Sequence, residues 1–278
     1  MGGDLIAARM PAMRRMLLLW TGLFLACSAR ADFQMFPSSY LYPHYIADPR
    51  RPEFGLTILG FPDPEIPDSG DRRVGLKLGG RFGLLRLGGW QVDIEAGFTG
   101  QFDIEHSLDN IGWDGTYGFL VSSALGKGVS VQLGTKHISS HVGDEYAERT
   151  GRRRIGYTRE ELVAGAAWSI DDRWRTYGEA GWGYKTKEDI GQERGRLQLG
   201  LEHEASLGDR LGWYAALDLQ AFEERNWQTD PTLQAGLLVP AGDRRWRVGL
   251  AVHDGAVPIG EFYQVDETYV ALGLWLAP

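Results

Sequence analysis

Two histidines and a serine alternate within one short stretch of this sequence. His137, Ser139 and His141 occupy every second position of the segment 136–145, which reads Lys-His-Ile-Ser-Ser-His-Val-Gly-Asp-Glu. On a β-strand these three side chains project from one face, because successive side chains point to opposite sides. A base held beside a hydroxyl can activate it as a nucleophile. The spacing therefore makes Ser139 a candidate nucleophile and His137 its candidate base.

A catalytic imidazole also needs an acid or an amide that orients its ring. The polar loop after the histidines is followed by another alternating stretch. If the two stretches form a regular hairpin, Glu160 lies roughly opposite His137 and on the same face. Glu161, Asp144 and Glu145 are alternatives, because this register is assumed. The sequence thus predicts a Ser/His/acid site in which Glu160 is the preferred acid.

Alternation of apolar with polar residues runs through most of the chain and predicts the strands that hold these residues. Trp90, Val92 and Ile94, for example, alternate with Gln91 and Asp93. Twelve strands are predicted, over residues 54–60, 74–84, 90–104, 114–125, 129–142, 155–170, 174–186, 195–206, 212–224, 232–240, 246–254 and 267–277. Beyond residue 31, no stretch of the chain shows a convincing 3.6-residue period of a helix.

The predicted strands are joined alternately by tight turns and by long loops. The turns lie at 126–128, 171–173, 208–210 and 241–243, and the polar loops at 61–73, 105–113, 143–154, 187–194, 225–231 and 255–266. Short turns at one end and long loops at the other are typical of outer-membrane barrels. Closure also removes the unpaired strand edges that lipid does not tolerate. The predicted fold is all-β, a single antiparallel up-and-down transmembrane β-barrel of about twelve strands.

Composition narrows the class of protein. The chain has 278 residues, 12% of them aromatic, and a mean hydropathy of -0.27, which argues against a bundle of membrane helices and against disorder. A single cysteine excludes an internal disulfide framework. The formal net charge of -8 becomes -11 without residues 1–31, because 25 basic side chains then face 36 acidic ones. Nucleic acid is therefore an unsuitable partner.

The segment 1–31 is predicted to be a secretory signal peptide. Three arginines precede an apolar run of 12 residues, 16–27, and Ala29-Arg-Ala31 is a small-x-small cleavage site. Lipidation of Cys27 is a weaker alternative. Cleavage near Ala31 leaves a chain for the bacterial outer membrane and its insertion machinery. The predicted organisation is a signal peptide (1–31), a Pro- and Tyr-rich periplasmic lead-in or plug (32–52) and the barrel (53–278).

If both ends of the barrel chain are periplasmic, the long loops are extracellular, and alternation assigns a set of charged side chains to the lumen. These are Lys77, Arg81, Asp93, Glu95, Lys136, Arg175, Glu179, Glu202, Asp218 and Arg247. Their mixed signs favour a network that fills the lumen over a charge-selective pore. The same alternation puts His137, Ser139 and His141 on the lipid face near the outer leaflet, where polar groups need partners or a purpose.

Five arginines cluster around the same loop: Arg149, Arg152, Arg153, Arg154 and Arg159. Beside the outer leaflet such a patch suits lipid phosphates, because arginine can bind them with two parallel hydrogen bonds. Anchoring of the loop by surrounding lipopolysaccharide is an equally good interpretation. The patch supports lipid contact without separating a substrate from the lipid around it.

The outward His-x-Ser pair resembles that of two families, outer-membrane phospholipase A and lipid A 3-O-deacylase. This resemblance implies a Ser139 nucleophile, a His137 base and an acid or amide on the neighbouring strand, with Ca²⁺ as a cofactor if the enzyme is phospholipase-like. Both families continue with Asn, whereas Ser140 stands in that place here. A fuller resemblance, carried by the segments 47–54, 137–145 and 175–181, is to an uncharacterised family of bacterial outer-membrane proteins.

The sequence therefore predicts an outer-membrane barrel of unassigned activity whose third extracellular loop contacts lipopolysaccharide. The alternatives are a lipid acyl hydrolase at Ser139 and a narrow channel. A metal site at His137, His141 and Asp144 is less favoured, because further ligands are not evident. In the plainest interpretation the two imidazoles only bind lipid headgroups or the next strand, and Ser139 does no chemistry.

Overall fold

The computed structural model describes residues 32–208, 210–242 and 244–277, so the predicted signal peptide lies outside the described part of the chain. Most of the described residues belong to strands. Within these residues, no helix is both long and apolar enough to span a membrane.

The wall is a closed antiparallel barrel of 12 strands, which confirms the predicted fold class. In chain order they are β2 (Gly55–Gly60), β3 (Arg72–Leu87), β4 (Trp90–Asp103), β5 (Asp109–Gly126), β6 (Val129–Val142), β7 (Thr158–Ser169), β8 (Trp174–Lys185), β9 (Gly195–Ser206), β10 (Gly212–Phe222), β11 (Thr229–Ala241), β12 (Arg244–Ala256) and β13 (Asp266–Ala277). Each strand pairs with the next, and β2 closes the ring by pairing with β13 as well as β3. The strand ends lie within a few residues of those predicted.

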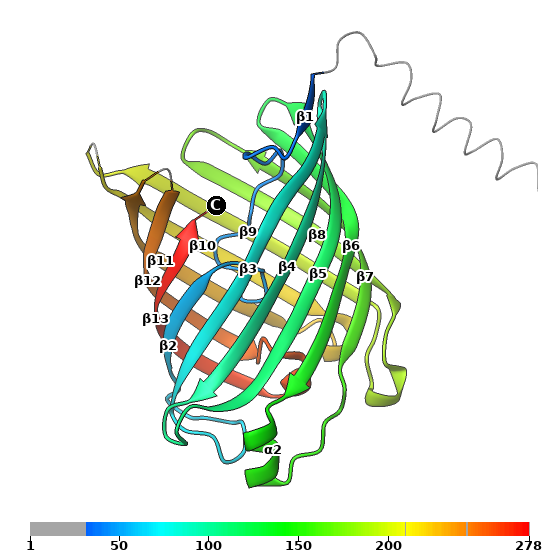
Figure 1. The fold of residues 1–278 in the computed structure, drawn as a ribbon, viewed down its shortest axis with the longest axis vertical. Coiled ribbons are helices and arrows are strands. Elements are labelled where there is room, and N and C mark those ends of the chain that lie inside the picture. Colours follow the sequence, from blue (N-terminus) through cyan, green and yellow to red (C-terminus); the bar gives the residue numbers. More distant parts are fainter. Residues whose placement is uncertain (1–31, 209, 243, 278) are drawn as a thin grey trace, which may run out of the picture.

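The two ends of the barrel differ as the loop lengths indicate. Tight turns lie at the end that holds the C-terminus, and the long connections lie at the opposite end (Figure 1). We call these the periplasmic and the extracellular end, as the sequence analysis predicts. The third long connection contains the helix α2 (Asp144–Thr150), and three others contain the single 3₁₀ turns η1 (Glu188–Ile190), η2 (Glu223–Arg225) and η3 (Gly260–Phe262). The sequence analysis missed α2, because a seven-residue helix is too short to show a period.

The outer face of the wall is apolar and the inner face is polar. Leu197, Leu199 and Leu201 of β9 are exposed on the lipid side, while Gln198 and Glu202, which point to the other face, are buried. Most of the predicted inward charges form ion pairs on the inner face of the wall or with the segment inside it. The pairs include Lys77–Glu53, Arg81–Glu95, Lys136–Glu179, Arg175–Glu202 and Arg247–Glu53. Ion pairs of mixed sign therefore fill the lumen, as the alternation predicts.

A segment before the barrel passes through this lumen. The short strand β1 (Phe33–Met35) pairs with the periplasmic end of β3, and residues 37–54 then run inside the barrel before β2 begins (Figure 1). Tyr42, Tyr45 and Ile46 of this segment are buried against the inner wall. We call residues 37–54 the luminal segment.

The extracellular end of the lumen is closed by an apolar cluster. Ile111 and Val142 from the wall pack with Tyr146 of α2 and with Ile259 and Phe262 of the last loop, and all five side chains are buried. The same loop is tied to the wall by polar contacts: the Gly260 N–H donates to Asp114, and the Glu261 N–H donates to Ser140 Oγ at 2.8 Å. This end of the lumen is therefore closed by the loops.

Candidate functional site

His137, Ser139 and His141 project from the outer face of β6, on its extracellular half. Their positions follow from the strand's alternation, which turns Lys136 and Ser140 towards the inside. The neighbouring strand β5 supplies an aromatic platform under each imidazole. Tyr117 stacks on His137 with ring centres 4.5 Å apart, and Trp113 stacks on His141 at 4.1 Å.

His137 is bonded to the acid that the hairpin register predicts. β6 and β7 pair so that His137 lies directly opposite Glu160. His137 Nδ1 and Glu160 Oε1 are 2.8 Å apart, and their side chains are 18% and 22% exposed. The other carboxylate oxygen lies 3.5 Å from the Tyr184 hydroxyl, which donates to it. The imidazole is therefore fixed by stacking on one side and by a carboxylate on the other.

Ser139 lies between two imidazoles and bonds to the one that has no acid. Its Oγ is 3.2 Å from His141 Nε2. In the part of the chain that the structure describes, no carboxylate hydrogen-bonds to His141. His137 is two positions away in the other direction, on the same face of the strand. The hydrogen bonds of the structure thus join His137 to Glu160 and Ser139 to His141.

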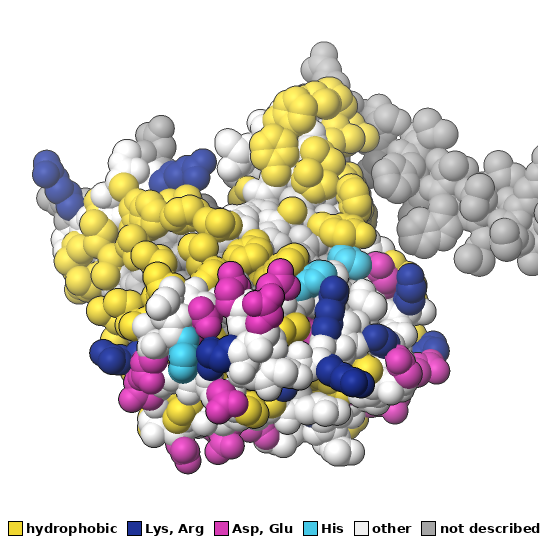
Figure 2. Space-filling view, turned by 60° about the horizontal axis from the view of Figure 1, so that its bottom comes forward, with side chains coloured by type: hydrophobic (Ala, Val, Ile, Leu, Met, Phe, Trp, Pro, Cys, Tyr) yellow, Lys and Arg dark blue, Asp and Glu magenta, His cyan; other side chains and the backbone are white. Residues whose placement is uncertain are grey.

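The site lies where the apolar belt meets the polar extracellular cap. Figure 2 shows histidine side chains on this border, with acidic and basic side chains beside them. Leu162 is the next outward residue after Glu160 on β7, and Trp182 is its partner on β8. Both side chains are half exposed on the lipid face. A lipid ester at the depth of the headgroups can therefore meet Ser139 from the membrane side.

A groove of about 600 Å³ adjoins the site on its extracellular side. It is lined by Trp113 and His141, by the start of α2 with Asp144, and by Arg152 and Arg154. The Arg154 side chain is 51% exposed. Arg152 lies over the ring of Phe262 and donates to the Glu261 carbonyl at 2.7 Å. Two cations thus border the groove next to His141.

The other predicted arginines have different surroundings. Arg153 is exposed in the loop, and Arg149 pairs with Asp109 across the neighbouring connection. The inclusion of Arg159 in the lipid-phosphate patch is wrong. Its side chain points into the lumen, is 1% exposed, and forms ion pairs with Glu161 and Glu224. Its neighbour Glu160 points outward, so alternation turns Arg159 inward.

The residues suit a serine site better than a metal site. Among the described residues, no three His, Cys, Asp or Glu side chains come together in a way that could hold a metal ion. The side chains near Ser139 therefore do not fit a Ca²⁺ site built by this chain alone, and we assign no step of a reaction to a metal. The sequence analysis also missed the platforms Tyr117 and Trp113, which only the cross-strand register reveals.

Comparisons with known proteins identify a family and a fold. A family model described as "Protein of unknown function (DUF1207)" matches residues 26–276. No curated protein matches significantly.

Solved structures of outer-membrane proteins are similar to this chain. Outer membrane phospholipase A from Escherichia coli aligns with a TM-score of 0.62 and 15% identity, over 85% of this chain and 95% of that one. A Salmonella typhi outer membrane phospholipase dimer with bound calcium aligns with a TM-score of 0.63 and 14% identity, over 87% and 94%. At this identity the likeness shows a shared fold, a barrel that resembles those of bacterial outer-membrane proteins.

Proposed function

The chain belongs to the DUF1207 family of proteins of unknown function, and we propose that it is a serine ester hydrolase that acts on lipids of the outer leaflet. In this proposal Ser139 is the nucleophile, His137 is the base, and Glu160 orients the base. The observation that carries it is the 2.8 Å hydrogen bond between His137 Nδ1 and Glu160 Oε1 on the lipid-facing side of the wall.

That hydrogen bond selects one form of the imidazole. An ionised carboxylate can only accept, so Nδ1 carries the hydrogen and Nε2 keeps its lone pair. Nε2 is then free to accept a proton from the Ser139 hydroxyl. Stacking on Tyr117 holds the ring in this orientation. A base that is oriented before the substrate arrives loses little entropy in the reaction.

Hydrolysis proceeds as two acyl transfers. Ser139 Oγ attacks the carbonyl carbon of the ester while its proton passes to His137 Nε2. Glu160 stabilises the imidazolium that forms. The imidazolium then gives the proton to the departing alcohol oxygen, which leaves an acyl group on Ser139. Water attacks that ester with the same base, and release of the fatty acid returns Ser139 to its hydroxyl form.

His141 has a different role in this proposal. It binds the Ser139 hydroxyl at 3.2 Å in the resting site but has no carboxylate to stabilise a positive charge. An imidazole without that support is the weaker base in a desolvated position. We therefore assign it to holding Ser139 until a lipid displaces the hydroxyl towards His137.

The arginines next to the groove support a phosphorylated lipid as the substrate class. Arg152 and Arg154 border the groove beside His141, and guanidinium groups bind phosphate oxygens with charge-assisted hydrogen bonds. Glycerophospholipids and lipid A both carry phosphate close to acyl esters. The proposal includes contact of this surface with lipopolysaccharide, after removal of the signal peptide near Ala31 and insertion by the outer-membrane machinery.

Mass spectrometry of lipids incubated with the folded protein tests the proposal. Phospholipid and lipid A are offered in separate reactions to the wild type, to Ser139→Ala and to Ser169→Ala, which removes an exposed hydroxyl at the far end of β7. The expected result is loss of an acyl chain with the wild type and Ser169→Ala only. Unchanged lipid in both wild-type reactions would overturn the proposal.

A further inference from the structure

Cations of the inner wall hold the luminal segment by its backbone. Four alternate carbonyls of that segment, at residues 42, 44, 46 and 48, each accept a hydrogen bond from a different wall cation. The donors are Arg81 at 3.5 Å, Arg175 at 3.0 Å, Arg247 at 2.8 Å and Lys77 at 3.2 Å, in that order. The luminal segment is thereby extended through a ring of positive charge.

Carboxylates of the lumen pair with these cations. Arg51 of the luminal segment pairs with Glu53 at 2.5 Å, and Glu53 is shared with Lys77 and Arg247. Arg81 pairs with Glu95 and Arg175 pairs with Glu202. These ion pairs join five cations to three carboxylates, and the carboxylate of Asp48 lines the same cavity as Arg51. The charges are therefore largely balanced, and what stays open is the set of N–H donors that no acceptor satisfies.

Several nitrogen atoms in this region have no hydrogen-bond acceptor among the described residues. They are Nε and Nη1 of Arg51, Nε2 of His44, and the Nε atoms of Arg81, Arg175 and Arg247. All these atoms are buried, and the Arg51 side chain is only 7% exposed. Buried donors in native proteins are almost always satisfied, so a cluster of unsatisfied ones indicates a bound molecule or ion.

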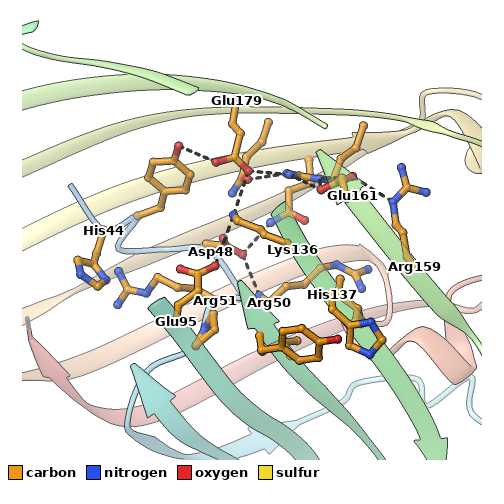
Figure 3. Close-up of a pocket in the computed structure, with 18 of the residues that line it drawn as sticks. His44, Asp48, Arg50, Arg51, Glu95, Lys136, His137, Arg159, Glu161 and Glu179 are labelled. Atoms are coloured by element: carbon orange, nitrogen blue, oxygen red, sulfur yellow. Dashed lines mark hydrogen bonds and ion pairs between the residues drawn. The ribbon is translucent and has the colours of Figure 1, made fainter. Parts of the chain in front are cut away.

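Three of these side chains line one cavity. His44, Arg51 and Arg81 border a space of about 70 Å³ inside the barrel, several times the room that one water molecule needs. Figure 3 shows His44 at one end of this cavity and Arg159 at the other. At the Arg159 end the charges are already matched, because Glu161 and Glu179 are bound by Arg196. The unmatched donors are at the His44 end.

We propose that the His44 end of this cavity binds a small oxyanion, held by Arg51, Arg81 and His44. Two nitrogens of Arg51 and one of Arg81 donate to the oxygens, and His44 Nε2 adds a fourth donor. Burial and the neighbouring Arg81 and Arg51 hold the pKa of His44 well below its usual range, so the ring is neutral and donates a single hydrogen.

The ligand chemistry is a phosphate or a carboxylate group of about the size of the free ion. Guanidinium groups bind both with parallel hydrogen bonds. The cavity is too small for a lipid headgroup with its chains. The site lies in the lumen, on the opposite side of the wall from Ser139, and does not depend on the proposed hydrolase.

Titration calorimetry with the folded full-length protein tests this inference. Inorganic phosphate and acetate are titrated separately into the protein in detergent, at constant ionic strength set with chloride. Arg51→Gln removes the main donor, and Arg173→Gln removes an exposed arginine of a tight turn as the matched control. We expect saturable binding by the wild type and by Arg173→Gln, and at least tenfold weaker binding by Arg51→Gln.

A second measurement uses only the wild-type protein, so its result does not depend on whether a variant folds. The ¹⁵N chemical shift of the His44 Nε2 atom in the wild type is followed during the same titrations, and it moves if an anion accepts from that nitrogen. Movement with phosphate alone identifies a phosphate site, and movement with acetate alone a carboxylate site. No heat of binding and no shift with either anion would overturn the inference and leave the cavity to water.

Discussion

Replacing Glu160 by Gln removes the negative charge of the acid but keeps a side chain of the same shape in the same place. Gln keeps an oxygen that can accept from His137 Nδ1, so the 2.8 Å contact and the ring orientation are retained. What is lost is the negative charge beside the imidazolium that forms in the transition state. We expect kcat to fall while KM stays unchanged, because Glu160 contacts neither the groove nor its arginines.

The size of the effect follows from the contact geometry. Two unit charges about 4 Å apart attract by about 4 kcal/mol at an effective dielectric constant near 20. Both side chains are about one fifth exposed, at 18% and 22%, so screening lowers this to about 2–4 kcal/mol. At about 1.36 kcal/mol for each factor of ten, kcat falls about 30- to 1,000-fold.

The assay is release of fatty acid from the lipid that the wild type cleaves, measured over a range of lipid concentrations. Glu148→Gln is the matched control, because that carboxylate is exposed on α2. His141→Ala is measured alongside. Wild-type kcat for Glu160→Gln, together with a large loss for His141→Ala, would refute the assignment of His137 as the base.

Three further predictions follow from other parts of the site. Arg154→Gln should raise KM about fivefold at low salt without changing kcat, because an exposed charge contributes about 1 kcal/mol and is screened; equal KM values at low and high salt would contradict this. Ser140→Ala leaves the buried Glu261 N–H without its acceptor and should lower the free energy of unfolding by about 1–3 kcal/mol, which urea titration measures. Arg159→Gln breaks two buried ion pairs and should lower it by about 3–5 kcal/mol, whereas the exposed Arg153→Gln should have almost no effect; equal losses would refute the inward position of Arg159.

The wall of the barrel could be predicted because every strand shows the same alternation of apolar and polar residues. Alternation with a period of two specifies both the strand and the face of each side chain, and the short turns specify which strands pair. The pairing of His137 with Glu160 was predictable for this reason, although a helix-containing loop separates the two strands. The extent of β6 was also predicted from its alternation.

Arg159 shows where this reasoning was not carried far enough. It was grouped with the loop arginines because it is close to them in sequence. The alternation that turns Glu160 outward already turns Arg159 inward, so the signal was present in the sequence. Facing within a strand is therefore a better guide to a shared surface than nearness along the chain.

Other features depend on contacts that no local pattern encodes. The luminal segment shows no alternation of apolar and polar residues that would predict its position. Its carbonyls are instead held by wall cations that are distant in sequence. The hydrogen bond from Ser139 to His141 depends on a side-chain rotamer, because the two histidines are equally spaced from the serine. Sequence spacing can therefore name the three residues without saying which imidazole binds the hydroxyl.

Covalent labelling of Ser139 tests the central claim most directly. The folded protein is treated with a lipid-like fluorophosphonate, and labelled peptides are identified by mass spectrometry. The account predicts one labelled serine, Ser139, with labelling abolished in Ser139→Ala and strongly slowed in His137→Ala. Labelling of another residue, or an unlabelled Ser139 in a protein that cleaves lipid, would contradict it.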